Sequence, residues 1–352
     1  MSAAPMLDYL LIGQGLAGTL LHHRLAVAGQ RVHVLDRGHE NAASAVAAGI
    51  VNPITGWRYV KSWRVGELLP EVARTYQELT DLLGEPCYFP GPIVRAIHDV
   101  KGENNWALRT ADPAYQPYLA EQPDTQIFAG KLHPAHAYGQ VEGGGRVAVR
   151  ALVHAYRRYL RDRGALTETT FDPEQLTAEP TGVRYGDLTA RRVVFCEGHR
   201  GRYNPWFGYL PFGGAKGEVL IVRIPGAGFD RLLKQRLFVV PLGEDRYWIG
   251  SAYENDYAHE RPTAAGRARL LEQLDALLTV PYEVLDHRAA VRPTVQDRRP
   301  FLGRHPGGLP LYIFNGLGTK GASLGPFFAR QMAGYLDADR LLDAEVDIRR
   351  FE

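Results

Sequence analysis

The sequence predicts an α/β fold in which a Rossmann-like nucleotide-binding domain is assembled from separate parts of the chain, with a second domain inserted into it. A glycine-rich turn follows a strand-like run and opens a helical stretch near residue 13, and the same arrangement recurs near residue 318. Between these ends, periodic α/β segments alternate with two stretches of different character, one rich in proline and aromatic residues and one with strand-like runs. Alternating strands and helices are typical of α/β domains.

The composition is that of a globular protein with about two domains. The chain has 352 residues, of which 45% are hydrophobic and 23% are charged, and these values exclude wholesale disorder. The formal net charge is only +2, and the chain has no dense run of Lys and Arg. Proteins that bind nucleic acids or anionic membranes normally carry a basic patch, so neither class of partner is expected.

Cysteine usage points to a reducing compartment. Cys87 and Cys196 are the only cysteines, too few for a disulfide scaffold or a Cys-rich zinc site. The twelve histidines form no HExxH pattern, so no metal site is predicted. The apolar run Leu10–Ile12 is too short to span a bilayer. We therefore expect a cytoplasmic protein.

The first forty residues predict a strand, a glycine turn, a helix and a second strand. The strand-like run Asp8–Ile12 leads into Gly13–Gly18, which has the GxGxxG pattern. Ala17, Leu21, Leu25 and Ala28 then follow helical spacing, and Gly29 stands where helices commonly end. The second strand-like run, Arg31–Leu35, is followed by Asp36. This order is that of a dinucleotide-binding unit.

Each glycine of this turn has a chemical reason. Gly13 permits the tight turn, Gly15 allows the backbone to approach a diphosphate, and Gly18 allows the helix to pack closely on the strand. Free N–H groups at the helix start bind the diphosphate. The alternative is a glycine turn shaped by packing alone. A carboxylate at Asp36 suits a ribose hydroxyl and disfavours NADP, and the choice between NAD and FAD stays open at this point.

The C-terminal segment carries a second glycine turn. Leu311–Phe314 is a strand-like run, Asn315–Gly321 is the turn, and a helical pattern follows from Leu324 onward. A unit that binds only NAD would not need a second glycine turn at the far end of the chain. The pattern therefore favours a flavin nucleotide.

At this point the chain resembles the D-amino-acid oxidase/glycine oxidase family of FAD-dependent oxidoreductases. The resemblance covers almost the whole chain, through short blocks in the family's order. These blocks are Gly13–Gly18 with Asp36, Ser44–Ile50, Val193–Gly198, Pro211–Glu218, Phe238–Pro241, Val291–Pro293 with Asp297, Pro300 and Gly303, and Gly316–Gly321.

The resemblance implies FAD as cofactor, held by residues of these blocks. The implied cofactor-binding residues are Gly13, Gly15, Leu16, Ala17, Gly18, Asp36, Arg37, Ser44, Ala48, Gly49, Ile50, Gly198, Gly318, Thr319, Lys320 and Gly321. It also implies a catalytic role for Lys320, which with the adjacent helix start would stabilise negative charge near N1 and O2 of reduced flavin. The alternative for Lys320 is an ordinary solvated lysine.

The resemblance further implies that Arg292 is catalytic and binds the substrate carboxylate. A guanidinium donates two parallel N–H bonds to a planar anion, which suits that task. The alternative is a structural ion pair with an Asp or Glu of this chain. The family commonly has a substrate-side tyrosine where this chain has Phe238; Phe238 and Tyr253 are expected at the substrate, with Tyr247 as another candidate for the missing phenol.

The segment Asn52–Arg64 mixes two tryptophans with Arg58, Lys61 and Arg64. Beside a cofactor, such a segment would suit an anionic or planar substrate. The alternative, slightly favoured, is that the aromatic rings pack in the protein and the cations face water.

By resemblance, the reaction is oxidation of the C–N bond of a small amino acid or secondary amine. Hydride passes to flavin N5, the imine hydrolyses in water, and oxygen or another acceptor takes the electrons. Two alternatives stay open: an FAD-binding protein without amine turnover, and a dehydrogenase with another substrate, such as the flavin domain of a tRNA-modifying enzyme. The near-neutral charge argues against RNA.

The resemblance and the segment pattern together predict a discontinuous Rossmann-like FAD-binding domain and a substrate domain with a mixed or antiparallel sheet. The active site is expected between the two domains. The predicted bounds are 1–85, 140–200 and 290–352 for the FAD-binding domain and 86–139 and 201–289 for the substrate domain.

Overall fold

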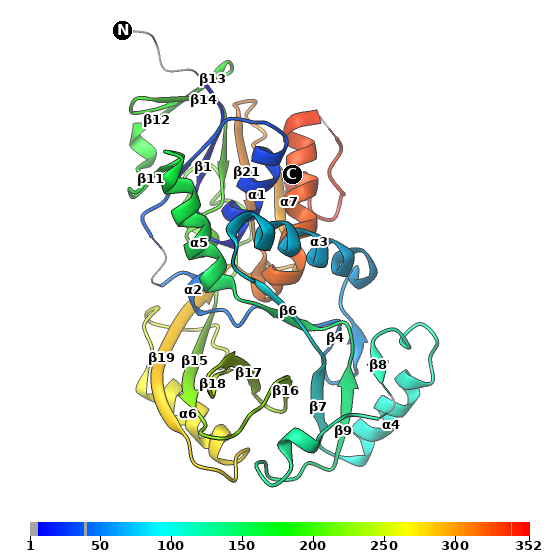
Figure 1. Cartoon of the computed structure of the whole chain (residues 1–352). Helices are drawn as coiled ribbons and strands as arrows, with labels where there is room; N and C mark the ends of the chain where they lie inside the picture. The colour runs from blue at the N-terminus through cyan, green and yellow to red at the C-terminus, as the bar shows by residue number, and fades with distance from the viewer. Residues whose placement is uncertain (1–5, 39–40, 121, 339) are drawn as a thin grey trace.

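The computed structural model describes residues 6–38, 41–120, 122–338 and 340–352. Two large sheets organise the chain (Figure 1). In the view of Figure 1, the first sheet lies with α1, α3 and α7 in the upper half, and the second sheet lies with α4 and α6 in the lower half. The fold is thus mixed α/β, as predicted.

The first sheet has the parallel core expected of a Rossmann-like unit. β1 pairs in parallel with β2 on one side and with β14 on the other. The strands, in spatial order, are β11 (Leu166–Thr167), β2 (Val32–Leu35), β1 (Leu7–Ile12), β14 (Leu188–Phe195), β13 (Gly182–Tyr185) and β12 (Leu176–Glu179), with β21 (Leu311–Asn315) against β14 and β20 (Phe301–Arg304) against β21.

The apolar runs become strands of this sheet because both of its faces are buried. Leu11 and Val194 face a core shared with helices, whereas Leu10 and Phe195 face a second core on the other side. The helices that contribute to the first core are α1 (Leu16–Val27), α3 (Val65–Leu83), α5 (Val149–Asp162) and α7 (Gly321–Ala338).

Helix α1 packs directly on helix α7, although the two lie at opposite ends of the sequence (Figure 1). Gly325 makes room for Leu20, because a Cβ atom at Gly325 would lie 2.6 Å from Leu20 Cδ1. The hydroxyl of Tyr76 in α3 donates a hydrogen bond to the carbonyl of Ala322 at 2.9 Å. These contacts bring the starts of α1 and α7 to one place.

The second sheet is largely antiparallel, and β16 and β7 form its parallel pair. Its strands, in spatial order, are β19 (Glu283–Arg292), β15 (Ala215–Arg223), β18 (Arg246–Gly250), β17 (Phe238–Gly243), β16 (Leu232–Lys234), β7 (Ile93–Ile97), β9 (Ala137–Val141) and β8 (Leu119–Ala120). Leu270 and Leu274 of α6 (Ala264–Asp275) pack on one face. Trp106 of α4 (Val100–Thr110) belongs to the core that includes Val219 and Val240.

Short elements complete the described chain. They are α2 (Ala43–Val46), the sheet of β3 (Ile50–Val51), β10 (Gly145–Val147) and β6 (Tyr88–Pro90), the hairpin of β4 (Ile54–Thr55) and β5 (Val60–Lys61), and the 3₁₀ turns η1 (Gln126–Phe128), η2 (Pro173–Gln175), η3 (Gly198–Tyr203), η4 (Gly318–Lys320) and η5 (Ile348–Phe351). Among the residues described, none of the helices has the length and apolar character needed to cross a bilayer.

The predicted elements at both ends of the chain are present. The first strand, helix and second strand are β1, α1 and β2, and Gly29 beyond α1 has the left-handed φ of +78° that was expected there. The predicted domain bounds stay a prediction. Most strands of each sheet come from the segments assigned to one domain, but β9 and β19 each run across a predicted bound.

The contact between α1 and α7 predicts a large loss of stability on truncation of Leu20. Leu20→Ala removes a fully buried side chain from α1 and leaves a cavity against α7, which costs about 2–5 kcal/mol of unfolding free energy. Leu108→Ala is the matched control, since Leu108 is a helical leucine that is 67% exposed. Urea denaturation of both variants measures the difference. Equal midpoints for the two variants would contradict the proposed packing.

Candidate active site

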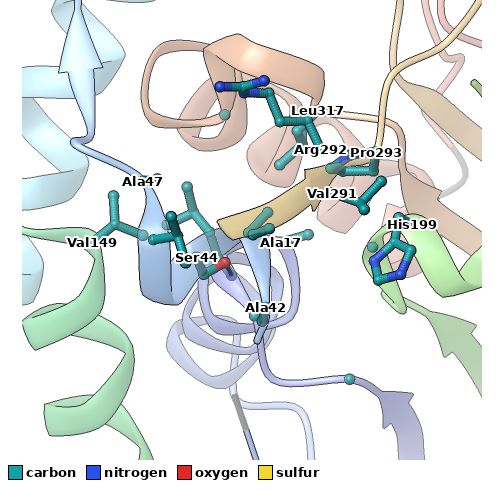
Figure 2. A pocket seen from close by; sticks show the side chains of 18 of the residues that line it. Ala17, Ala42, Ser44, Ala47, Val149, His199, Val291, Arg292, Pro293 and Leu317 are labelled. Carbon is teal, nitrogen blue, oxygen red and sulfur yellow. Dashed lines mark hydrogen bonds between the residues drawn. The ribbon is translucent and has the colours of Figure 1, made fainter. Parts of the chain in front are cut away.

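A cavity of about 950 Å³ lies between the two sheets (Figure 2). From the first sheet it is lined by residues at the carboxyl ends of β1, β2, β14 and β21, and from the second by residues of β15, β17, β18 and β19. Ligands of open α/β sheets bind at the carboxyl ends of the strands. The volume is near the top of the usual range for small-molecule pockets, so the cavity suits an extended ligand.

The first glycine turn has the conformation that its sequence predicts. Gly13 has a φ of +101°, and a Cβ atom there would lie 2.6 Å from the carbonyl oxygen of Cys196. A Cβ atom at Gly18 would lie 1.9 Å from the carbonyl oxygen of Gly13, so Gly18 lets the helix pack against the turn. Gly15 lines the cavity where α1 begins, and the hydroxyl of Ser44 accepts a hydrogen bond from the N–H of Leu16 at 3.0 Å.

Asp36 follows β2 at the edge of the cavity and is held by three donors. Its carboxylate accepts hydrogen bonds from the N–H groups of Gln14 at 2.8 Å and Gly38 at 2.7 Å. Arg157 of α5 donates to the same carboxylate at 2.7 Å. Sequence reasoning missed Arg157. The sequence did contain a sign of this role, because Arg157 lies on the face of α5 that is otherwise formed by apolar residues such as Leu160.

The block Ser44–Ile50 lines the cavity between α1 and the second sheet. A Cβ atom at Gly49 would lie 1.9 Å from the carbonyl oxygen of Val147, so only glycine allows β10 to approach. The indole N–H of Trp248 in β18 donates to the carbonyl of Val46 at 2.8 Å. This bond joins the second sheet to the last residue of α2.

The second glycine turn opens on the same cavity as the first. Gly318 has a φ of +57°, and its N–H donates to the carbonyl of Pro293 at 3.0 Å. Figure 2 shows Leu317 beside Arg292, the last residue of β19, and Pro293, which follows it. A Cβ atom at Gly321 would lie 3.4 Å from Leu16, the first residue of α1. The two helix starts therefore supply positive electrostatic potential to one cavity.

Lys320 is not a freely solvated lysine. Its ammonium donates to the hydroxyl of Ser62 at 3.1 Å, and the residue lines the cavity. Burial lowers the pKa of Lys320, and the nearby Arg298 and Arg299 lower it further. No carboxylate within the described ranges forms an ion pair with Lys320.

Arg292 reaches the cavity from the end of β19 (Figure 2). Its guanidinium donates to the hydroxyl of Ser251 at 2.7 Å and lies 5.5 Å from the centre of the Tyr253 ring. Burial lowers its pKa, and Tyr253 opposes that shift. Gly217 makes room for the guanidinium, because a Cβ atom there would lie 2.1 Å from it. The alternative, a structural ion pair, is not observed, because no described Asp or Glu pairs with Arg292.

The cavity brings together all the predicted site residues except Gly18, which packs behind the turn. Phe238 and Tyr253 both line it, and Tyr253 is half exposed. Tyr247 was wrong as a candidate for the missing phenol. Its hydroxyl accepts a hydrogen bond from the N–H of Phe229 at 3.0 Å in a separate core, because alternate residues of β18 face opposite sides of the sheet.

The cationic aromatic segment lies outside the cavity apart from its first residues. Asn52 and Thr55 line the cavity, whereas Trp57 is 60% exposed and lies beneath the guanidinium of Arg58 at 4.6 Å. Arg64 pairs with Asp343 and Glu67. The favoured alternative, in which the aromatic rings pack in the protein and the cations face water, therefore describes this segment.

Sequence reasoning missed several residues that line the cavity, namely Glu197, His199, Asn204, Trp248 and Ser251.

Comparison with known proteins identifies the family. Residues 8–335 match the DAO family, described as FAD dependent oxidoreductase. A glycine oxidase of Pseudomonas aeruginosa is 24% identical over 352 residues, which is 92% of this chain and 93% of that protein.

Solved structures share the fold. The crystal structure of glycine oxidase from Geobacillus kaustophilus superposes with a TM-score of 0.80 at 21% identity, covering 97% of each chain. That of iminodiacetate oxidase from Chelativorans sp. BNC1 has a TM-score of 0.78 at 21% identity, covering 96% of this chain and 98% of that one.

The cavity fits the family's cofactor. FAD is an extended dinucleotide, and the cavity has a helix start and a glycine turn from each end of the chain. Cβ atoms at Gly13, Gly18 and Gly49 would collide with backbone carbonyl oxygens around this cradle. The residues present are therefore suited to FAD.

Because Gly18 lies so close to the carbonyl of Gly13, we expect Gly18→Ala to bind FAD weakly. The added methyl group would displace the carbonyl of Gly13 and distort the turn, an overpacking that costs about 1–3 kcal/mol, or roughly a 10- to 100-fold weaker affinity. The ratio of visible to ultraviolet absorbance of the purified protein reports bound FAD. Gly91→Ala is the control, since open space surrounds Gly91. A Gly18→Ala protein as yellow as the control would refute the role of the turn.

Proposed function

This chain belongs to the DAO family of FAD dependent oxidoreductases, and we propose that it oxidises the C–N bond of a small amino acid or secondary amine that carries a carboxylate. Two similar proteins support this substrate class, a glycine oxidase and an iminodiacetate oxidase. The observation that carries the proposal is Arg292, a cation in the cavity whose described surroundings include no pairing carboxylate.

Arg292 would bind the substrate carboxylate and so place the amine. Its guanidinium is anchored by Ser251 and lies over the ring of Tyr253, while Gly217 leaves the space that it occupies. A half-buried guanidinium in this setting binds a planar carboxylate through two parallel N–H bonds. Phe238 lines the same cavity and would exclude water from the apolar side of the substrate.

FAD, when bound, accepts the hydride from the carbon that carries the amine. The residues of this chain contribute alignment and electrostatics. Holding the substrate in one orientation supplies much of the rate enhancement, because it removes the entropy cost of the encounter. Lys320 and the N–H groups at the start of α7 would stabilise negative charge at the pyrimidine edge of the flavin.

The remaining parts of the proposal concern product, acceptor and location. The imine would hydrolyse in water, and oxygen or another acceptor would take up the electrons. The presence of only two cysteines supports a cytoplasmic location. A net charge of +2 supports a small-molecule substrate rather than a nucleic acid.

An anaerobic titration tests the function. We expect the purified protein to be yellow and its visible bands to be bleached by one or more members of a panel of amino acids and secondary amines that carry a carboxylate. The amines of the same size without a carboxylate serve as controls. If dithionite bleaches the flavin and no amine does so, the amine-oxidising function is wrong and an FAD-binding protein or a dehydrogenase for another substrate is indicated.

Two variants test the role of Arg292. Arg292→Leu should raise KM for carboxylate substrates roughly 10- to 100-fold, the loss expected when a charged hydrogen-bonded anchor is removed, and should leave bound FAD unchanged. Gly217→Ala should raise KM in the same direction without removing the charge, because its methyl group would displace the guanidinium. Steady-state kinetics and flavin absorbance measure both effects. Unchanged KM in both variants would refute carboxylate binding by Arg292.

A further inference from the structure

Glu197 is a half-buried acid in the cavity that the proposed reaction does not use. It follows β14, directly after Cys196, and lines the cavity. Its backbone adjoins the first glycine turn, since a Cβ atom at Gly13 would lie 3.4 Å from the Cα of Glu197. An acid at this position is unexpected, because an anionic ligand is expected at the turn.

One oxygen of Glu197 is fixed by Asn204. The side-chain oxygen of Asn204 accepts hydrogen bonds from the N–H groups of Trp206 at 2.9 Å and Phe207 at 3.0 Å. The orientation of the amide is therefore set, and its NH₂ group donates to Oε2 of Glu197 at 2.8 Å. No group of the described chain donates a hydrogen bond to the other oxygen, Oε1. That oxygen is available to a ligand in the cavity.

The strand order places Glu197 away from the ribose side of the cradle. In the first sheet β1 lies between β2 and β14, so Asp36 and Glu197 stand on opposite sides of the turn that begins with Gly13. Asp36 is the residue positioned for a ribose hydroxyl. Glu197 therefore stands beside the glycine turn, where the N–H groups at the start of α1 would bind a diphosphate.

The charged and titratable groups around Glu197 come from several elements. Cys196 adjoins it in sequence, and the pKa of that thiol is raised by burial and by Glu197. His199 of η3 pairs with Glu260 at 2.7 Å. The other charged groups that line the cavity are Asp36, Arg37, Arg200, Arg292 and Lys320. None of the described cations forms an ion pair with Glu197, so its carboxylate form has no counter-charge.

We propose that Glu197 binds the FAD diphosphate as the neutral carboxylic acid, donating a hydrogen bond from Oε1 to a phosphate oxygen, so that FAD affinity falls as the pH rises. A carboxylate at this place would repel the diphosphate and could donate no hydrogen bond. The inference concerns the cofactor alone and holds whether or not the enzyme oxidises amines.

The direction of the pH dependence follows from proton linkage. Burial raises the pKa of Glu197 to about 7, although the hydrogen bond from Asn204 opposes this shift. A bound phosphate that accepts its proton raises the pKa further. Below the pKa of the free protein both states hold the proton, and the affinity is constant. Above it, FAD binding takes up a proton, and Kd rises up to about tenfold per pH unit.

The experiment measures FAD release from the holoprotein. The holoprotein is diluted in buffers between about pH 6 and pH 9. This range covers the pKa of an ordinary histidine and that of a carboxyl group whose pKa is raised. Flavin fluorescence reports the FAD released. If too little FAD leaves on dilution, the urea midpoint of FAD release is compared across the same buffers. We expect Kd of the parent protein to rise about tenfold or more across this range.

Three variants distinguish the effect of Glu197 on FAD affinity from the effects of other titratable groups. Glu197→Gln keeps a hydrogen-bond donor at every pH, so its affinity should stay high and its pH dependence should disappear. Glu197→Ala should bind FAD about tenfold more weakly than the parent at the acidic end, the loss of one charge-assisted hydrogen bond. His199→Gln is the matched control for the nearby imidazole and should keep the slope of the parent.

Three results would overturn the proposal. The first is that Kd of the parent protein for FAD does not change with pH. The second is that the affinity rises with pH, as expected if a carboxylate accepted a hydrogen bond from a ribose hydroxyl. The third is that Kd of Glu197→Gln depends on pH as strongly as that of the parent protein. Thermal unfolding of each holoprotein shows whether a variant is folded, and Glu197→Gln, which changes no heavy-atom count, keeps the test valid if Glu197→Ala does not fold.

Discussion

The close approach of α1 and α7 is the contact on which the active site depends. The two helices begin at glycine turns about 300 residues apart in the sequence, and small residues let them meet: Gly325 accommodates Leu20, and Gly321 lies against Leu16. Because both helices pack on the same face of the parallel sheet, their first turns open on one cavity. Two sets of backbone N–H groups can then act on a single dinucleotide.

The electrostatics of the cavity differ from one end to the other. Around the first glycine turn lie two acids, Asp36 held by Arg157 and Glu197 held by Asn204. At the end of β19 and the start of α7 lie two cations, Arg292 and Lys320, whose contacts in the described chain are hydroxyl and carbonyl oxygens rather than carboxylates. Burial without a counter-charge is costly. Cations kept in this state are therefore suited to anionic groups of a bound ligand.

The second sheet acts as a support for Arg292. β15 and β19 are antiparallel neighbours, and Gly217 on β15 leaves the space that the guanidinium fills. The indole N–H of Trp248 in β18 donates to the carbonyl of Val46, the last residue of α2, so the second sheet is joined to the segment that follows the first glycine turn and β2. The position of Arg292 relative to the first glycine turn thus depends on contacts between segments that are distant in the sequence.

Local pattern by itself predicted the first and last supersecondary units and the mixed α/β class, and the family resemblance added many of the residues that line the cavity. Glycine turns between apolar runs and helical spacing are signals that neighbours in the chain carry, and Gly13, Asp36 and Gly318 follow from them. Only the tertiary structure decided the partners of these residues. Arg157, Asn204 and Ser251 come from other elements, and Tyr247 turned away from the site. Sequence spacing specifies which face of an element a side chain occupies, whereas packing between distant elements specifies what that face meets.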